Sequence, residues 1–526
     1  MDDHYLHHVE DIGLACHIKR NLKAAVLATS VKNKDIKKVA LETFKSTELE
    51  VHVKNALYKE YMKLKLIGIQ NSSDFLLRNN EAFGDYGCFI KEPVDFIEEV
   101  QTKWSTRLRQ AINRMSAQFG VPLSKQRTGP EQEYVLSQWG SLSQMLTGGD
   151  VKEFRPLFTA KDIFEILCTI RNPNLTEKAM VDLERWKMLP LNITVKSLQD
   201  LKIQFEQLDP KLVQLDSAAY SSETAEDEVL LQTSKVIKKG LYAAARFLCR
   251  YGCPTGNRFE LWRMAFCIDF SGGKHVLHFE KLKQMVIKYK FLFDSILLQD
   301  LKNTVANDDN YFVFEDLLYQ ILFTFLRDTE IQEIGSYAPV DLPMARTKRK
   351  VGISDREVVY PPSGVIPIHG FSYYIAPLCF TQANPIPLYV VFSAMYKRYL
   401  FHLHTISSHP NSLLSLCCLF EDVLQQKNPT LVLHLKSIKA EPLKLAYKWI
   451  LYAFSGYLDP DQVLLLWDRI VGFDSLEIVP ILAAAVFHFR ATSLLHISSL
   501  AEAEGVLGNL HTLKVLPLMQ HMLFLD

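Results

Sequence analysis

Apolar side chains recur every three or four residues between positions 93 and 119, and no other feature restricts the fold of this chain as strongly. Pro93 suits the start of a helix and Gly120 suits its end. The apolar positions between them are Ile97, Val100, Trp104, Leu108, Ile112, Met115 and Phe119. Residues three and four apart share one side of an α-helix, so this segment is predicted to be an amphipathic helix packed against a core.

A weaker form of the same pattern extends over most of the chain. It is found at 34–66, 160–171, 176–188, 195–207 and 236–248. Alternation of apolar and polar residues, which would indicate strands, is never sustained beyond four or five residues. The sequence therefore predicts an all-α protein.

Length and local composition suggest how these helices are organised. A chain of 526 residues exceeds what one core usually accommodates. The stretch 216–229 is acidic, lacks basic residues and is predicted to be a linker, because it has little apolar surface to bury. The expected order is an N-terminal helical region of unknown role (1–215), this acidic linker, a multi-helix domain (230–495) and a C-terminal helical cap (496–526).

Two further segments are interpreted as irregular. Residues 120–150 are rich in Gly, Ser and Gln and are predicted to form a long connection. Residues 334–368 contain several prolines and a basic run from Arg346 to Lys350, and are predicted to be a loop inserted in the multi-helix domain. The basic run is typical of a solvated loop and is weak evidence for a lipid contact.

Charge and cysteine usage exclude several classes of function. The 59 basic residues balance the 59 acidic ones, so no overall field attracts nucleic acid or an anionic membrane. The most apolar segment, "LEIVPILAAAVFHF", is too short to span a bilayer and is predicted to be a buried core helix. Nine cysteines without disulfide-type spacing, and a polar start, predict a cytoplasmic protein with at most peripheral association with endomembranes.

One group of residues can be arranged as a zinc site. It consists of Cys249, Cys253, Cys267, His275 and His278. No second closely spaced pair follows the first two cysteines, and free cysteines are commonly small buried hydrophobic residues. The sequence therefore favours buried cysteines over a zinc site. Phosphate-binding loops, nucleophile elbows and HExxH motifs are absent from the sequence, so nothing indicates a self-contained enzyme.

Four motifs follow one another in the C-terminal half. "GCPTGNRFELW" supplies Gly252, Pro254, Arg258 and Trp262. "LLQDLKNT" supplies Leu297, Asp300 and Thr304. "PIHGFSYYIAP" supplies Gly370 and Pro377. The last helical segments supply His434, Leu435, Trp449, Phe454, Trp467 and Asp468. In this order the motifs resemble the TBC domain family, the all-helical Rab GTPase-activating proteins, over about residues 245 to 490.

The resemblance implies a site with two catalytic side chains. In the family, the second motif supplies an arginine finger and the third a glutamine finger, and both act on a Rab-type GTPase that brings its own GTP and Mg²⁺. The arginine position is Asn303 here, and the glutamine position is His369. Asp300 is expected to organise the finger helix, and Gly370 to allow close approach of the backbone.

The remaining motif residues are expected to support the fold. They are Gly252, Pro254, Arg258, Trp262, Thr304, Pro377, Trp449, Trp467 and Asp468.

The missing arginine decides the predicted activity. An arginine finger contributes about 10³–10⁵ in rate, or roughly 4–7 kcal/mol. Asn303 is short and neutral, and Lys302 points about 100° away around the helix. A neutral imidazole at His369 can still hydrogen-bond to water. The sequence therefore predicts a Rab-binding regulator of membrane trafficking with weak or absent two-finger activity.

Alternatives remain open at this point. Arg346 or Arg349 in the insertion could supply a displaced finger, although mobile loops rarely hold the required geometry. The chain could instead be an active GTPase-activating protein that uses non-standard groups, or a helical scaffold that engages no GTPase.

Overall fold

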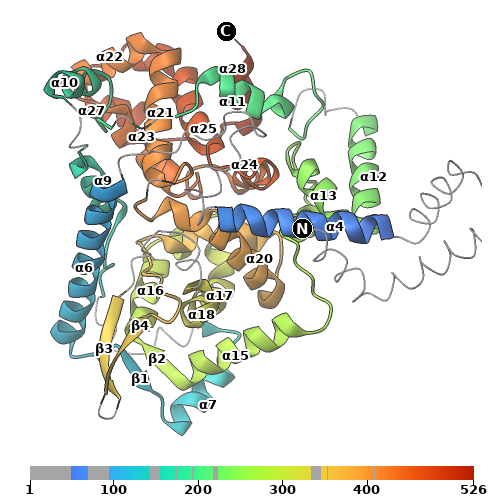
Figure 1. Ribbon diagram of the computed structural model, residues 1–526, viewed down its shortest axis with the longest axis vertical. Helices are drawn as coiled ribbons and strands as arrows, with labels where there is room; N and C mark the ends of the chain where they lie inside the picture. The colour runs from blue at the N-terminus through green and yellow to red at the C-terminus, as the bar shows by residue number, and fades with distance from the viewer. Residues whose placement is uncertain are drawn as a thin grey trace, which may run out of the picture.

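The computed structural model describes residues 49–68, 94–142, 154–171, 176–191, 193, 195–216, 223–332, 345–351, 354–407 and 409–525. Regular structure within these ranges is predominantly α-helical, which confirms the predicted fold class (Figure 1). Two short antiparallel strand pairs accompany the helices. Of the weak helical stretch 34–66, only the part from residue 49 lies within the described residues.

The elements fall into three consecutive groups. The first comprises α4 (Leu49–Gly68), α6 (Val94–Phe119), β1 (Ser124–Gln126), α7 (Gly129–Ser137), α9 (Ala160–Thr169), α10 (Glu177–Trp186), α11 (Leu198–Gln204), η1 (Glu206–Leu208) and α12 (Glu223–Lys239). The second comprises α13 (Tyr242–Cys249), α14 (Arg258–Ala265), α15 (Lys274–Lys288), β2 (Tyr289–Phe291), α16 (Leu292–Asn303), η3 (Val305–Asn307), η4 (Phe312–Phe314), α17 (Glu315–Arg327), α18 (Thr329–Gln332), β3 (Ala345–Val351) and β4 (Ser354–Tyr360). The third comprises η5 (Phe371–Tyr374), η6 (Ala376–Phe380), α20 (Pro385–Arg398), η7 (Leu400–Leu403), α21 (Leu413–Lys427), α22 (Pro429–Ser437), α23 (Pro442–Leu451), α24 (Pro460–Phe473), α25 (Ile478–Phe489), α26 (Ala491–Leu494), α27 (Leu500–Leu507) and α28 (Val515–Phe524).

Helix α6 has the apolar face that its sequence predicts. Ile97, Trp104, Leu108 and Ile112 on this face are all buried. Trp104 meets the ring of Phe158 edge-on, with 5.3 Å between the ring centroids. Full burial of one such side chain stabilises a fold by about 1.5–3 kcal/mol, so this face accounts for the position of the helix.

Helix α25 lies in the interior of the fold. Every residue from Ile478 to Phe487 is buried, and α21, α23, α24 and α28 pack around the helix (Figure 1). A helix that is apolar on all sides must be enclosed by other elements, which is the structure predicted for this segment. Within the described ranges, no helix combines the length and hydrophobicity needed to cross a bilayer.

The hydrophobic core is continuous across the predicted linker. Leu189 and Phe205, which precede it, belong to the same buried cluster as Trp262 and Leu466, which follow it. Helix α12 begins at Glu223, so the second half of the acidic stretch 216–229 is helical and differs from the linker predicted from its composition. Apolar packing on distant helices, which local composition does not reveal, joins the two parts.

The stretch 120–150 is not merely a connection. Strand β1 pairs antiparallel with β2, with Ser124 opposite Phe291 and Gln126 opposite Tyr289, and α7 follows. The prediction of a connection was wrong for these residues, because the partner strand lies more than 160 residues away. Residues 143–150 of this stretch lie outside the described residues. Arg127 reinforces the pairing by donating a 2.6 Å hydrogen bond to the carbonyl of Val286.

The inserted segment also contains regular structure. Strands β3 and β4 form an antiparallel hairpin in register from Ala345 opposite Tyr360 to Val351 opposite Ser354. After the hairpin, the chain turns inward and buries Val365, Ile366 and Ile368. The prediction of an irregular loop over 334–368 was therefore wrong for these residues, because each strand satisfies the backbone hydrogen bonds of the other. Strand β3 lies beside α6 (Figure 1).

The continuous core leads to a prediction about fragments. We expect residues 230–526 alone to lack a cooperative unfolding transition, because β2 loses its partner strand and the core loses the apolar faces of α6, α9 and α11. Residues 49–526 should unfold cooperatively and serve as the control. Urea denaturation followed by circular dichroism measures both, and a cooperative transition of equal midpoint in the short fragment would contradict the expectation.

Candidate functional site

The carboxylate of Asp300 joins the second motif to the third. Asp300 lies in the last turn of α16 and is only 5% exposed. Its two oxygens accept hydrogen bonds of 2.9 and 3.0 Å from the backbone N–H of Gly370, and one of them also contacts Nδ1 of His369. The structure therefore brings together Asp300, His369 and Gly370, three of the predicted site residues.

The backbone around His369 is fixed from three directions. Its N–H donates to the carbonyl of Phe158 at 3.0 Å, and its own carbonyl accepts a 2.6 Å hydrogen bond from the hydroxyl of Tyr452. The N–H of Gly370, the next residue, donates to the carboxylate of Asp300. Each peptide group thus has a partner from a different part of the chain, and the imidazole is presented from a rigid support.

Gly370 meets two separate requirements at this position. Its φ of +78° is in the left-handed region, which side chains with a Cβ rarely adopt. A Cβ on Gly370 would also lie 3.2 Å from both Cδ2 of Tyr373 and the hydroxyl oxygen of Tyr452. The motif glycine is therefore required for the turn that presents His369, and two aromatic rings close against it.

Asn303, the last residue of α16, has an exposed side chain. Its Oδ1 accepts a 3.1 Å hydrogen bond from Gln299, one turn earlier. Thr304 turns the chain back by donating to the carbonyl of Asp300 at 2.7 Å, and its hydroxyl lies 3.3 Å from that of Ser372 in the third motif. The end of α16 and the turn that carries His369 are therefore in contact.

The local field favours a protonated His369. The hydrogen bond with Asp300 raises the pKa of His369 above its ordinary value of 6.5, although partial burial and the charge of Lys448 act in the opposite direction. The side chain remains 37% exposed. Because Nδ1 is engaged with Asp300, Nε2 is the ring nitrogen available to a ligand or partner.

A buried ion pair fixes the start of α16. Asp294 caps the helix by accepting a 2.8 Å hydrogen bond from the N–H of Phe291. The two terminal nitrogens of the Arg327 guanidinium, Nη1 and Nη2, contact the same carboxylate, and Nη2 does so at 2.6 Å. Nη2 of Arg327 also donates to the carbonyl of Tyr289 in β2 at 3.0 Å. The finger helix is thus held at its first turn by Arg327 and at its last turn by the contacts of Asp300.

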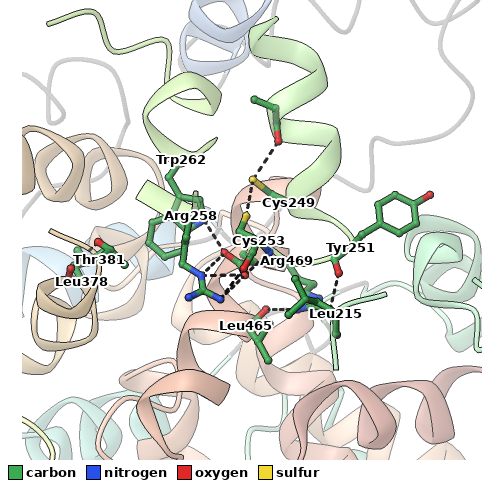
Figure 2. Close-up of polar contacts among 12 residues, drawn as sticks. Leu215, Cys249, Tyr251, Cys253, Arg258, Trp262, Leu378, Thr381, Leu465 and Arg469 are labelled. Atoms are coloured by element: carbon green, nitrogen blue, oxygen red, sulfur yellow. Dashed lines mark hydrogen bonds and ion pairs between the residues drawn. The ribbon is translucent and has the colours of Figure 1, made fainter. Parts of the chain in front are cut away.

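A second carboxylate network organises the first motif and the final helices (Figure 2). Asp468 is completely buried. It accepts hydrogen bonds from Nε of Arg258 at 3.1 Å, Nε1 of Trp262 at 2.8 Å and the N–H of Cys253 at 2.9 Å. Burial by itself would lower the pKa of Arg258, but Asp468, together with Cys253 and Asp461, raises it above its ordinary value.

Gly252 allows the chain to pass this network closely. Its φ is +96°, and a Cβ there would lie 2.8 Å from Cβ of Leu215 and 3.0 Å from a guanidinium nitrogen of Arg469. Arg469 in turn donates to the carbonyls of Leu215 and Tyr251 (Figure 2). Pro254 is buried in the turn that precedes α14 and accepts a 2.9 Å hydrogen bond from the N–H of Asn257.

The other motif residues pack in the interior. Trp467 donates its indole N–H to the carbonyl of Ala453 at 3.1 Å. Trp449 stacks on Phe454 with 6.0 Å between ring centroids. Pro377 is buried at the start of η6. His434 lies 3.0 Å, through Nε2, from the carbonyl of Ile497, while Leu435 beside it is buried.

The cysteines do not gather with the histidines of the sequence pattern. Cys249 and Cys253 are completely buried and lie with their sulfur atoms 3.4 Å apart. Burial raises the pKa of the Cys253 thiol well above its ordinary value, which disfavours the thiolate that zinc requires. Among the described residues, the one cluster with metal-binding geometry contains His278 together with two carboxylates.

Comparison with known proteins identifies relatives of this chain. The model of the Rab-GTPase-TBC domain matches residues 368–495, which include His369 and Gly370. The human protein TBC1 domain family member 19 is 39% identical over 515 residues, which cover 97% of this chain and 95% of that protein. The chain belongs to the TBC family of Rab GTPase regulators.

A solved structure, the TBC domain of a Chlamydomonas flagellar RabGAP, is also similar to this TBC protein. It is 13% identical, with a TM-score of 0.41, and the match covers 62% of this chain and 96% of that one.

Sequence reasoning missed several residues that build the site. The carbonyl of Phe158 and the hydroxyl of Tyr452 position His369, and the pair Asp294–Arg327 positions α16. These residues are separated from their partners by 33 to more than 200 positions, so spacing within one motif contains no sign of them. A buried aspartate in the first turn of a helix, as at Asp294, is the one local signal that indicates a cap.

The Asp468 network predicts a large loss of stability on substitution. Removing one partner from a buried charge pair costs about 3–5 kcal/mol, because the other charge remains buried without compensation. We expect Asp468→Asn to lower the free energy of unfolding by this amount, measured by urea denaturation. Asp461→Asn, at an exposed position of the same helix, is the control and should change it by less than about 0.5 kcal/mol. A small effect at both positions would contradict the assigned role of the network.

The raised pKa of His369 predicts a pH-dependent contribution to stability. The folded state binds the proton more tightly than the unfolded state, so the contribution is complete below about pH 6.5 and is lost as the pH rises through the folded pKa. We therefore expect the difference in unfolding free energy between the native protein and His369→Gln to shrink from about pH 6 to about pH 8.5. Denaturation at both pH values measures it, and a difference that grows with pH would contradict the His369–Asp300 pairing.

Proposed function

We propose that this TBC protein binds a GTP-loaded Rab-type GTPase through the surface that carries Asn303 and His369, and that it is weak or inactive as a two-finger GTPase-activating protein. The proposal rests on the position of Asn303, whose exposed, neutral side chain lies at the end of α16 beside the turn that carries His369. The GTP and Mg²⁺ belong to the partner. Any association with endomembranes is peripheral and follows from the partner's location.

The charge at the finger position limits the chemistry. An arginine at the end of this helix would place a guanidinium near a transferring phosphoryl group, which is worth about 10³–10⁵ in rate. The amide of Asn303 has no charge, and its oxygen is engaged by Gln299. Lys302 precedes it by one residue and therefore points about 100° away around the helix axis.

The His369–Asp300 pair provides the remaining chemistry of the site. Asp300 holds Nδ1 and stabilises the imidazolium form, while Nε2 can donate a hydrogen bond to a water molecule or a phosphate oxygen. An imidazolium is shorter than an arginine side chain and lacks its forked geometry. We infer that His369 strengthens recognition of a bound nucleotide triphosphate on the partner more than it accelerates hydrolysis.

Arg346 and Arg349 are placed on β3, but their side chains lie outside the described residues. A finger supplied from this hairpin therefore stays a prediction from the sequence, and its test is the same hydrolysis assay.

Single-turnover hydrolysis and nucleotide-dependent binding together test the proposal. Across a panel of Rab GTPases, we expect the full chain to capture one or more in the GTP-loaded form in preference to the GDP-loaded form. We expect its effect on the hydrolysis rate to be far below the roughly 10³–10⁵ typical of an arginine finger. Acceleration within that range would overturn the proposed inactivity, and capture of no Rab in either form would favour the alternative of a helical scaffold.

Restoring the fingers provides a further prediction for any Rab that binds. The double variant Asn303→Arg with His369→Gln should accelerate hydrolysis at saturating complex, by at least about tenfold, because it restores the charge that stabilises the transition state. Asn303→Gln with His369→Gln is the matched control, since it restores the length without the charge and should give no acceleration. Equal rates for both variants would show that the finger position is not what limits hydrolysis.

A further inference from the structure

We propose that His278, Asp328 and Glu330 form a binding site for a divalent transition metal, with Zn²⁺ as the ion that best fits the donors. One nitrogen of His278 and one oxygen from each carboxylate lie within 4.8 Å of one another. His278 is on α15, Asp328 follows the last residue of α17, and Glu330 is in α18. The site would therefore join two helices that lie side by side (Figure 1).

The distance between His278 and Asp328 fits a small tetrahedral ion. Nε2 of His278 lies 3.3 Å from Oδ2 of Asp328. Two ligands bound at about 2.0–2.2 Å to a tetrahedral ion are separated by roughly 3.4 Å. Oε1 of Glu330 lies 3.6 Å from the other ring nitrogen, Nδ1. The half-exposed Glu330 side chain would therefore have to turn toward Nε2 to join an ion bound there by His278 and Asp328. Imidazole nitrogen and carboxylate oxygen are both ligands that Zn²⁺ accepts, and the imidazole favours Zn²⁺ over Mg²⁺ or Ca²⁺.

The carboxylate of Asp328 is already oriented by groups that would not bind the ion. The N–H of Glu330 donates to Oδ1 at 2.9 Å, and the hydroxyl of Tyr389 donates to Oδ2. Metal ligands are commonly held in this way by a surrounding layer of hydrogen bonds. Nε2 of His278 is shielded from solvent and makes no hydrogen bond of good geometry, so its lone pair is available when the ring is neutral.

A proton competes with a metal ion for the ring nitrogen of His278. The interactions with Asp328 and, to a smaller extent, with Glu330 raise the pKa of His278. Partial burial and the charge of Lys397 on α20 act in the opposite direction. A protonated His278 would bridge the two carboxylates as an ion pair. Metal affinity should therefore decrease as the pH falls, because the ion must displace this proton.

The position of the site gives the metal a structural role. Asp328 directly follows Arg327, whose guanidinium holds Asp294 in the first turn of α16. An ion that ties Asp328 to α15 would fix the end of α17, and through Arg327 the start of the helix that carries Asn303. The inference does not depend on the proposed function, because it concerns metal binding to the full chain by itself.

Zinc titration of the metal-free full-length protein, followed calorimetrically and by thermal unfolding, tests the site. We expect Zn²⁺ to raise the unfolding temperature, because it binds the folded state preferentially. His278→Ala and Glu330→Gln should each weaken the Zn²⁺ affinity by at least roughly 10–100-fold. Removing a residue that only orients a metal ligand already causes a loss of this size. Glu330 is half-exposed, so its variant tests the site without risk to folding.

The matched control is His275→Ala, one turn earlier on the same helix, which should bind Zn²⁺ as the native protein does. Co²⁺ provides a separate readout, since nitrogen and oxygen ligands give visible absorption without the sulfur-to-metal band of thiolate ligands. Equal Zn²⁺ affinity in the native protein, His278→Ala and Glu330→Gln would overturn the proposal. A sulfur-to-cobalt band, which would place the ion at cysteines, or no binding at all would also overturn it.

Discussion

The hydrogen bonds between Asp300 and the His369–Gly370 turn are the interaction on which the site depends. They join the last turn of α16 to a segment nearly seventy residues later, and they do so inside the protein, where a charge–dipole contact is strong. The contact between Thr304 and Ser372 is a second link between the helix end that carries Asn303 and the turn that carries His369. Asp300 therefore defines the geometry of the site although it is itself buried.

This arrangement is supported from the N-terminal half of the chain. Phe158 accepts the hydrogen bond of His369, and β1 pairs with the strand that leads directly into α16. The apolar face of α6 holds the Phe158 ring in place through Trp104. Described residues far upstream of the family motifs thus make contacts that hold the His369 turn in place.

The two buried carboxylates have different roles: Asp468 stabilises the fold, and Asp300 positions a side chain of the candidate site. Asp468 binds Arg258 and Trp262 in the interior and holds the first motif against α24. Asp300 leaves one face of His369 exposed, so the same type of group tunes a side chain that a partner can reach. The motif residues that build these networks are retained, whereas the position that would insert a cation into a partner is an asparagine. Under the proposed function, such a chain keeps the surface for recognition while the electrostatic contribution to hydrolysis is missing.

The sequence by itself determined the helical class, the amphipathic face of α6, the buried helix α25 and the order of the motifs, because these depend on local periodicity and on residue identity. It also placed Asp300, Asn303, His369 and Gly370 at the site by resemblance, and the identity of Asn303 sets its charge in any fold. Only the tertiary structure decided that Asp300 holds both His369 and Gly370, that Phe158 and Tyr452 fix the turn, and that 120–150 and 334–368 contain paired strands. These contacts join residues from tens to hundreds of positions apart, and hydrogen bonds between distant backbone groups leave no periodic pattern in the chain.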